Sequence, residues 1–200
     1  SNGVRGIRLG KDDHVIAIAV LSQGHLAPEE RQAYLRQAAK MRQLGNQNGE
    51  GTSEEEEPSE DEEITDYKIT PERFQELAAQ EQFILTITEK GFGKRSSAYE
   101  YRTTNRGSQG YASISVNARN GGVVASFPVN SDNQILLVTD QGQLIRCPIH
   151  DIRIMRRSKT AQGVIIFRVG VDEKVVAVSC IPAGEETEAE ETAEGAETED

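Results

Sequence analysis

The sequence predicts an all-β fold made of propeller-like blades, each a sheet of four antiparallel strands, and three observations support this. A pattern recurs every 51 to 53 residues, with one copy starting at Ile84 and the next at Ile135. Each copy contains short apolar segments of strand length, separated by turns that contain Gly, Asn and Asp. A fixed period near fifty residues, built from short strands, is typical of repeated blades.

The N-terminal residues repeat only the second half of this unit. Gly3 to Ile18 aligns with Gly163 to Val178 without a gap. We therefore predict two strands, at residues 4–9 and 15–21, joined by a turn that contains Gly10. Residues 1–21 are interpreted as half a blade, so we expect a partial ring that belongs to a larger array.

Residues 22–80 interrupt the repeat and are interpreted as an insertion. A first helix is predicted at residues 28–44, because Pro28 stands near its start with two acids in the first turn. Tyr34, Ala38 and Met41 form its predicted buried stripe.

A second, short helix of the insertion is predicted at residues 71–80. Thr70 is its candidate N-cap, and Phe74, Leu77 and Ala78 share one face.

Two blades are predicted after the insertion, at residues 81–130 and 131–182. Alternation of apolar and polar residues points Ser115 and Arg168 outward from their strands. The predicted strands of the two blades are 83–88, 94–101, 111–116, 123–129, 134–139, 143–149, 163–169 and 174–181.

The formal net charge of -11 conceals two parts of opposite sign. Residues 50–66 hold ten acids and residues 184–200 hold nine, with no base in either tract. The remainder has 14 acids against 22 Lys and Arg, a net charge of about +8. We predict that the linker at 45–66 and the tail at 183–200 are disordered, because such tracts bury too little apolar surface. They either maintain solubility or compete with a polyanionic ligand for the basic surface.

The basic residues recur with the blade period. Arg95 and Arg146 are 51 residues apart, as are Arg102 and Arg153. Repetition places such cations on the same edge of successive blades, and a continuous basic track of this kind suits the closely spaced phosphates of nucleic acid. The alternative is a set of ordinary solvated loop charges. The candidates for phosphate contact are Arg5, Arg8, Lys94, Arg95, Arg102, Arg106, Arg146, Arg153, Arg156, Arg157, Lys159 and Arg168.

The sequence offers no arrangement of catalytic or metal-ligating residues. His14, His25 and His150 are scattered, and no phosphate-binding loop of the GxxxxGK type occurs. Cys147 and Cys180 are predicted to be reduced core thiols in apolar strands, which fits a cytoplasmic protein. No apolar run is long enough to span a membrane.

Several segments closely resemble the C-terminal domain family of DNA gyrase A subunits. They lie within residues 1–21 and 82–182: Val4 to Leu9, Lys90 to Arg95, Arg102 to Gly110, Leu137 to Gly142, and Gln162 to Ile165. The acidic tail also resembles the tails of these subunits. Topoisomerase IV has similar C-terminal blades in its A subunit and remains an alternative. The gyrase-specific box rich in Gln, Arg and Gly is absent from this sequence, so it does not separate the two families.

The resemblance implies a β-pinwheel, in which neighbouring blades exchange a strand and duplex DNA bends around a basic rim without sequence preference. In the family this wrapping lets an ATP-dependent type II topoisomerase introduce negative supercoils. The implied partners are the gyrase B subunit and the N-terminal cleavage core of gyrase A, in an A2B2 assembly on the bacterial chromosome in the cytoplasm. The catalytic tyrosine, the Mg²⁺ site and the ATPase lie in other domains, so this domain alone is expected to hold no cofactor and to have no enzymatic activity. A propeller that binds acidic or disordered proteins is the competing class.

Overall fold

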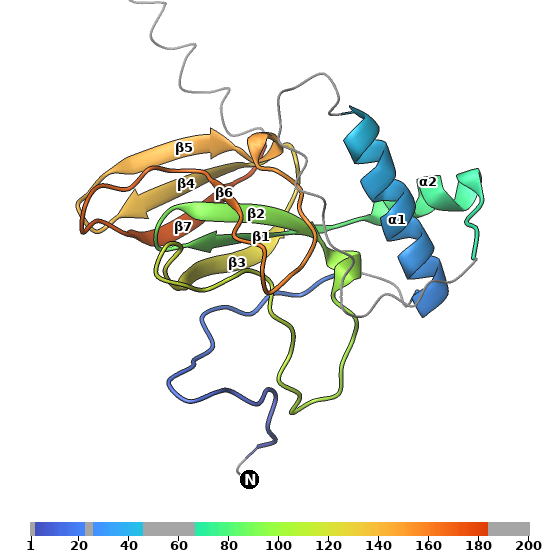
Figure 1. Ribbon diagram of the computed structural model, residues 1–200, viewed down its shortest axis with the longest axis horizontal. Coiled ribbons are helices and arrows are strands. Elements are labelled where there is room, and N and C mark those ends of the chain that lie inside the picture. Colours follow the sequence, from blue (N-terminus) through green and yellow to red (C-terminus); the bar gives the residue numbers. More distant parts are fainter. Residues whose placement is uncertain (1–2, 23–25, 46–66, 184–200) are drawn as a thin grey trace, which may run out of the picture.

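Two antiparallel sheets and a pair of helices make up the computed structural model, which describes residues 3–22, 26–45 and 67–183 (Figure 1). The predicted acidic tail except Ala183, and the predicted acidic linker except Gly45, lie outside the described residues. Neither helix in the described ranges is long and apolar enough to cross a membrane.

One sheet has four strands and the other has three, and each is built mainly from one copy of the repeat. The first has the order β3 (Val123–Val129), β1 (Phe83–Thr88), β2 (Phe92–Ser97) and β6 (Val164–Ile165). The second has the order β5 (Leu144–Pro148), β4 (Gln134–Thr139) and β7 (Val175–Ile181).

The period of the sequence is present in the strand register. Phe83 pairs with Ser97 in the first sheet, and Gln134 pairs with Pro148 in the second, each 51 residues later. The register also shifts at matching places, after Ile87 in the first sheet and after Val138 in the second. The two sheets are therefore copies of one structural unit.

Strand β6 belongs to the second repeat but completes the sheet of the first. Val164 pairs with Gly93 on β2, so neighbouring repeats exchange a strand. A Cβ atom at Gly93 would lie 2.9 Å from the carbonyl oxygen of Thr86 and closer still to the side chain of Ile166. The glycine therefore permits the close approach of the exchanged segment, as expected for a pinwheel.

The main core lies between the two sheets. Leu85 and Ile87 from β1 pack with Ile135 and Leu137 from β4, and all four side chains are fully buried. Burying each such side chain stabilises the fold by about 1.5–3 kcal/mol relative to leaving it exposed. This core joins the two repeats into one body.

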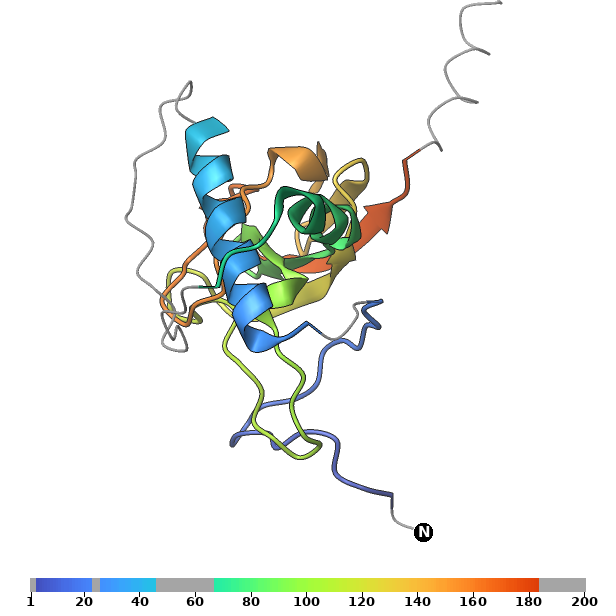
Figure 2. The same ribbon diagram turned by 90° about the vertical axis from the view of Figure 1, so that its right-hand side faces the viewer.

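The helices α1 (Pro28–Gly45) and α2 (Pro71–Gln80) lie together at one end of the sheets (Figures 1 and 2). Both were predicted, and Thr70 caps α2 by accepting a hydrogen bond from the backbone of Arg73. Tyr34 and Leu77 pack around Tyr99, which follows β2, and form a second core.

The predicted buried stripes were only partly right. Met41 is 55% exposed, because the cluster that buries Tyr34 and Ala38 does not extend along α1 to this turn. On α2, Leu77 is buried but Ala78 is exposed.

Three predicted strands, at residues 4–9, 15–21 and 111–116, are absent from the structure. The predicted strand at 163–169 is reduced to β6, and the one at 94–101 is replaced by β2 and a 3-10 turn at Ala98–Glu100. A strand needs a hydrogen-bonded neighbour. In the second repeat the matching segments pair with β2 and β4. Among the described residues, β5 is the copy of β2 and β1 is the copy of β4, and neither pairs with any of the three segments.

The half-blade nevertheless keeps the backbone turns of its full copy. Gly3 and Gly163 have φ values of 71° and 76°, and Asp12 and Asp172 have 63° and 60°. The local sequence therefore sets these turns even where no sheet forms.

Candidate nucleic-acid interface

Most of the predicted phosphate contacts lie on the surface. Arg156 and Arg157 are half-buried, and only Lys94 and Arg95 are in the interior. The exposed members are Arg5, Arg8, Arg102, Arg106, Arg146, Arg153, Lys159 and Arg168.

The prediction that Lys94 and Arg95 contact phosphates requires correction. Their exposed fractions are 0% and 5%, because β2 is buried along its whole length. The Nζ atom of Lys94 donates a hydrogen bond to the carbonyl oxygen of Arg156 at 2.6 Å. The blade period grouped Arg95 with Arg146, which is exposed, but the second repeat covers β2, and the sequence pattern alone did not show this.

The side chain of Arg95 donates hydrogen bonds to three other residues of the protein. Its Nε atom donates to the carbonyl oxygen of Ile152 at 2.6 Å, and its Nη atoms donate to the carbonyl oxygen of His150 and to the hydroxyl of Ser131. Burial lowers the pKa of Arg95, and the nearby charge of Arg42 lowers it further. Arg95 therefore joins the two repeats and is not placed to meet DNA.

The basic loops of the two repeats meet at Tyr111. The guanidinium carbon of Arg102 lies 5.4 Å from the centre of this ring, and that of Arg157 lies 4.6 Å from it. The Nε atom of Arg102 also donates to the tyrosine hydroxyl. Cation–π contacts of this kind orient arginines on a surface. Tyr111 was expected to lie in a strand, so its role as a support for two arginines was missed.

The N-terminal segment brings two further arginines to the same end of the molecule. Arg8 N donates to the carbonyl oxygen of Ser108, and Gly107 N donates to that of Gly6, both at 2.8 Å. This segment and the loop that follows β2 both extend below the sheets (Figures 1 and 2). Arg5 and Arg8 therefore lie beside the loop that carries Arg102 and Arg106.

The structure does not bring every candidate to this end. Arg146 lies on β5, which Figure 1 shows on the opposite side of the sheets from the N-terminal segment. An interface that includes Arg146 must therefore extend around the sheets, as the path of a bent duplex would.

Arg119 is an exposed basic residue that the sequence pattern did not single out. Its guanidinium carbon lies 5.3 Å from the centre of the Phe92 ring, and its Nη1 atom donates to Gln162 at 3.1 Å. Its position within the turn at 118–120, outside the two periodic loops, is the reason it was missed. The contact with Gln162 places it beside the loop of the second repeat.

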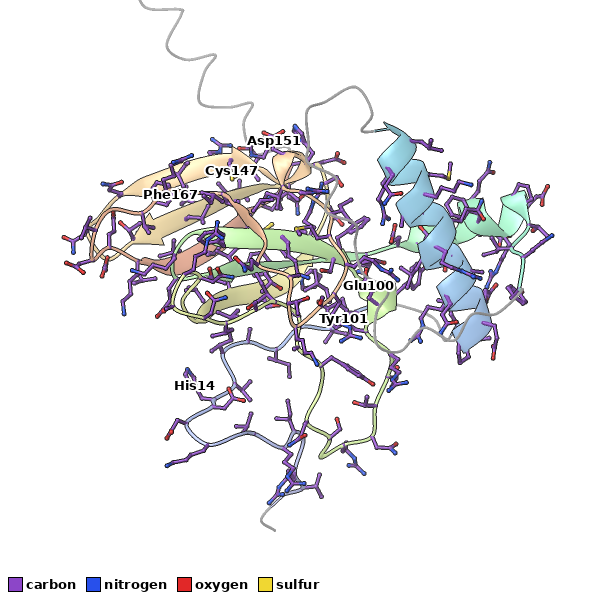
Figure 3. All side chains as sticks on the ribbon, viewed as in Figure 1. His14, Glu100, Tyr101, Cys147, Asp151 and Phe167 are labelled. Atoms are coloured by element: carbon purple, nitrogen blue, oxygen red, sulfur yellow. The ribbon has the colours of Figure 1, made fainter. Side chains whose placement is uncertain are left out.

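A half-buried carboxylate, that of Glu100, lies beside this basic surface. Glu100 accepts a hydrogen bond from the backbone N–H of Arg157, and Figure 3 shows Glu100 beside the end of β2. Burial raises the pKa of Glu100, while the hydrogen bond from Arg157 and the charge of Lys94 act in the opposite direction.

The described residues contain no group of three or more His, Cys, Asp or Glu side chains that could hold a metal ion. Figure 3 shows His14 on the N-terminal segment, far from Cys147 and Asp151 at the other side of the sheets. On the described surface, the arginines are the side chains best suited to bind a ligand, and they suit an anionic one.

Comparison with known proteins identifies the repeat. A family model described as the DNA gyrase C-terminal domain, beta-propeller, matches residues 1–22, 82–130 and 133–182. These segments together cover more than half of the chain, and they leave out the two helices.

Curated relatives are similar along nearly the whole chain. The DNA gyrase A protein of Granulibacter bethesdensis is 45% identical over 89% of this chain and 19% of its own length. The DNA gyrase A protein of Rickettsia prowazekii is 42% identical over 98% of this chain and 20% of its own length. This chain thus spans about a fifth of the length of these relatives. The Rickettsia match also includes the region of the two helices, so the insertion is not peculiar to this chain.

Solved structures give partial overlaps. One described as DNA gyrase A C-terminal domain has 27% identity and a TM-score of 0.46, covering 50% of this chain and 33% of that one. Another, of the C-terminal domain of DNA topoisomerase IV, has 18% identity and a TM-score of 0.46, covering 51% of this chain and 31% of that one.

Proposed function

This chain belongs to the DNA gyrase C-terminal domain family of β-propellers, and we propose that it binds duplex DNA and bends it along its basic loops. The observation that carries the proposal is the meeting of the two repeats' basic loops at Tyr111, with Arg5 and Arg8 beside them. Arginines gathered from separate segments give several phosphate contacts on one surface.

The arrangement favours binding without sequence preference. Apart from Arg146 on β5, the exposed candidate cations lie on loops and irregular segments, whereas direct base reading usually inserts a helix or a two-stranded ribbon into the major groove. Phosphate contacts fix the position of the duplex but carry no sequence information. We therefore expect similar affinities for duplexes of different sequence.

Bending sets a minimum on the number of contacts. Smooth bending of 20–30 base pairs by 40–90° costs on the order of 1–6 kcal/mol, which a single phosphate contact does not offset. Cations on both sides of the sheets, such as Arg102 and Arg146, would share this cost along a curved path.

In the whole protein we propose that this wrapping serves an ATP-dependent type II topoisomerase that introduces negative supercoils. The partners would be the gyrase B subunit and the N-terminal cleavage core of gyrase A, in an A2B2 assembly. The site of action would be the bacterial chromosome in the cytoplasm. ATP and Mg²⁺ would act through other domains.

Charge reversal tests the proposal directly. The double variant Arg102→Glu and Arg106→Glu places two acids on an exposed loop, so its fold should be retained. We expect at least about a tenfold loss of affinity for a labelled 40-base-pair duplex, equal for two unrelated sequences. The matched control replaces Arg36 and Lys40, two exposed cations of α1, with Glu and should bind nearly as the unmodified chain does. Equal losses in the two double variants would show that only net charge matters and would overturn the proposed surface.

A further inference from the structure

Strand β2 holds a segment of the second repeat along its outer edge. This segment, residues 150–157, is called the junction loop here, and it carries Arg153, Arg156 and Arg157. Arg95 N donates to the carbonyl oxygen of Arg153 at 3.0 Å, and Met155 N donates to that of Arg95 at 2.8 Å. The loop is therefore paired with β2 through a short parallel bridge.

Side chains of β2 add further hydrogen bonds to the same loop. Lys94 donates to the carbonyl oxygen of Arg156 at 2.6 Å, and Ser96 donates to that of Met155 at 2.9 Å. Arg95 donates to the carbonyl oxygens of Ile152 and His150, at 2.6 and 3.1 Å. All of these acceptors are main-chain atoms, so the bonds fix the path of the loop.

The end of the loop is fixed by Glu100. Its carboxylate accepts from Arg157 N, and its carbonyl oxygen accepts from the Nε atom of Arg157 at 3.3 Å. The ring of Tyr111 lies against the same guanidinium group. The junction loop is thus held by β2 along its length and by Glu100 at its end.

A fully buried lysine is costly for the folded state, because its ammonium group must be removed from water. The second sheet does without buried cations at the equivalent positions. Ile145 occupies the register position of Lys94, and Arg146, at the position of Arg95, is exposed. In the described part of the chain β5 pairs with β4 alone. The buried cations therefore occur on the strand that holds a basic loop and not on its copy.

We propose that Lys94 and Arg95 are positioning residues of the DNA interface, which hold the junction loop in one path so that its three arginines meet phosphates at a fixed spacing. This inference rests on the proposed DNA-binding function. Ordering a loop during association lowers affinity, and a loop already ordered by β2 avoids that loss. Lys94 and Arg95 affect DNA binding only by holding the junction loop, and neither residue contacts the DNA.

The test uses the full 200-residue chain with Lys94→Met, which keeps the buried volume and removes the donor. Three quantities are measured: duplex affinity across a salt series, hydrogen exchange of the amides at 152–157, and the melting temperature. We expect faster exchange in the loop and at least about a fivefold loss of affinity. The slope of log K against log salt, which is negative, should become less steep by about one to two, as for the loss of one or two phosphate contacts. The melting temperature should change by only a few degrees.

Matched variants in the second sheet separate positioning from direct contact. Ile145→Met changes the position equivalent to Lys94 and should alter neither binding nor exchange. Arg146→Met should make the salt dependence of binding less steep by about one, without changing hydrogen exchange of the amides in the junction loop. If Lys94→Met does not fold, Ser96→Ala, which removes one hydrogen bond to the same loop, gives the test in milder form.

Two results would overturn the inference. Unchanged affinity and slope in Lys94→Met, with faster exchange of the loop, would show that its order is irrelevant to DNA. Unchanged exchange would show that Lys94 does not hold the loop. If the unmodified chain fails to bind duplex DNA at low salt, the proposed function is wrong, and the inference is wrong with it. This outcome needs no variant, so it is distinguished from a failure of the inference alone.

Discussion

At the scale of single residues, three ionisable groups lie where the two repeats meet. Lys94 and Arg95 are buried there, and the carboxylate of Glu100 accepts a hydrogen bond from the backbone N–H of Arg157 in the junction loop. Burial raises the pKa of Glu100 despite the cations around it. Its charged form is therefore less favourable in the folded state than in the unfolded chain, which links stability to pH.

The sign of this dependence follows from proton binding. A carboxyl group whose pKa is raised by folding binds more protons in the folded state, so its contribution to stability falls as pH rises from the unfolded pKa, about 4.3, through the folded value. We expect Glu100→Gln to remove this contribution. Its free energy of unfolding, measured in urea from pH 4 to 8, should decline less with pH than that of the unmodified chain. A steeper decline in the variant would contradict the assignment.

Tyr111 is the second residue whose role is specific to this arrangement. Tyr111→Leu removes the ring beneath Arg102 and Arg157, and each exposed cation–π contact contributes about 0.5–1 kcal/mol. We expect about a fivefold loss of duplex affinity, measured by fluorescence anisotropy. Tyr111→Phe keeps the ring and serves as the control. Equal losses in both variants would assign the effect to the hydroxyl that Arg102 contacts and not to the ring.

At the scale of elements, a strand forms where both its pattern and its partner are present. Residues 123–129 and 134–139 were predicted with the bounds of β3 and β4, and the helices were predicted within one residue. Residues 111–116 have a suitable pattern, but none of the described strands pairs with them. Lys94 was misplaced for the related reason that strand exchange covers β2. Local sequence thus predicted the elements, whereas burial depended on contacts between repeats that no local pattern records.

The exchange of β6 makes a sharp prediction at Gly93. A Cβ atom there would meet Ile166 and the carbonyl oxygen of Thr86, so Gly93→Ala should displace β6 and destabilise the fold by about 1–3 kcal/mol. The control is Gly6→Ala, where no atom lies within 4 Å of the new Cβ atom. Urea unfolding of both variants checks this, and equal stabilities would contradict the close approach.

At the scale of the whole molecule, charge is divided between a basic folded part and two acidic tracts. Residues 184–200 hold nine acids, enough to compete with phosphates for the surface that carries Arg102 and Arg106. Because the tail follows β7 directly, its effective concentration near the sheets is high.

Removing residues 184–200 distinguishes competition from simple solubility. We expect the shortened chain to bind duplex DNA several-fold more tightly at low salt, with a difference that shrinks as salt screens both interactions. Anisotropy titrations of the two chains measure this. Equal affinities at low salt would leave solubility as the role of the tail.

In the proposed function, arginines from both repeats form one phosphate-binding surface. The most direct test is the dependence of duplex affinity on salt for the unmodified chain, measured between about 50 and 200 mM. Each phosphate neutralised contributes about -0.9 to the slope of log K against log salt, so a surface that engages about five phosphates predicts a slope near -4 to -5. A slope near zero, or no duplex binding at low salt by a folded chain, would contradict the account.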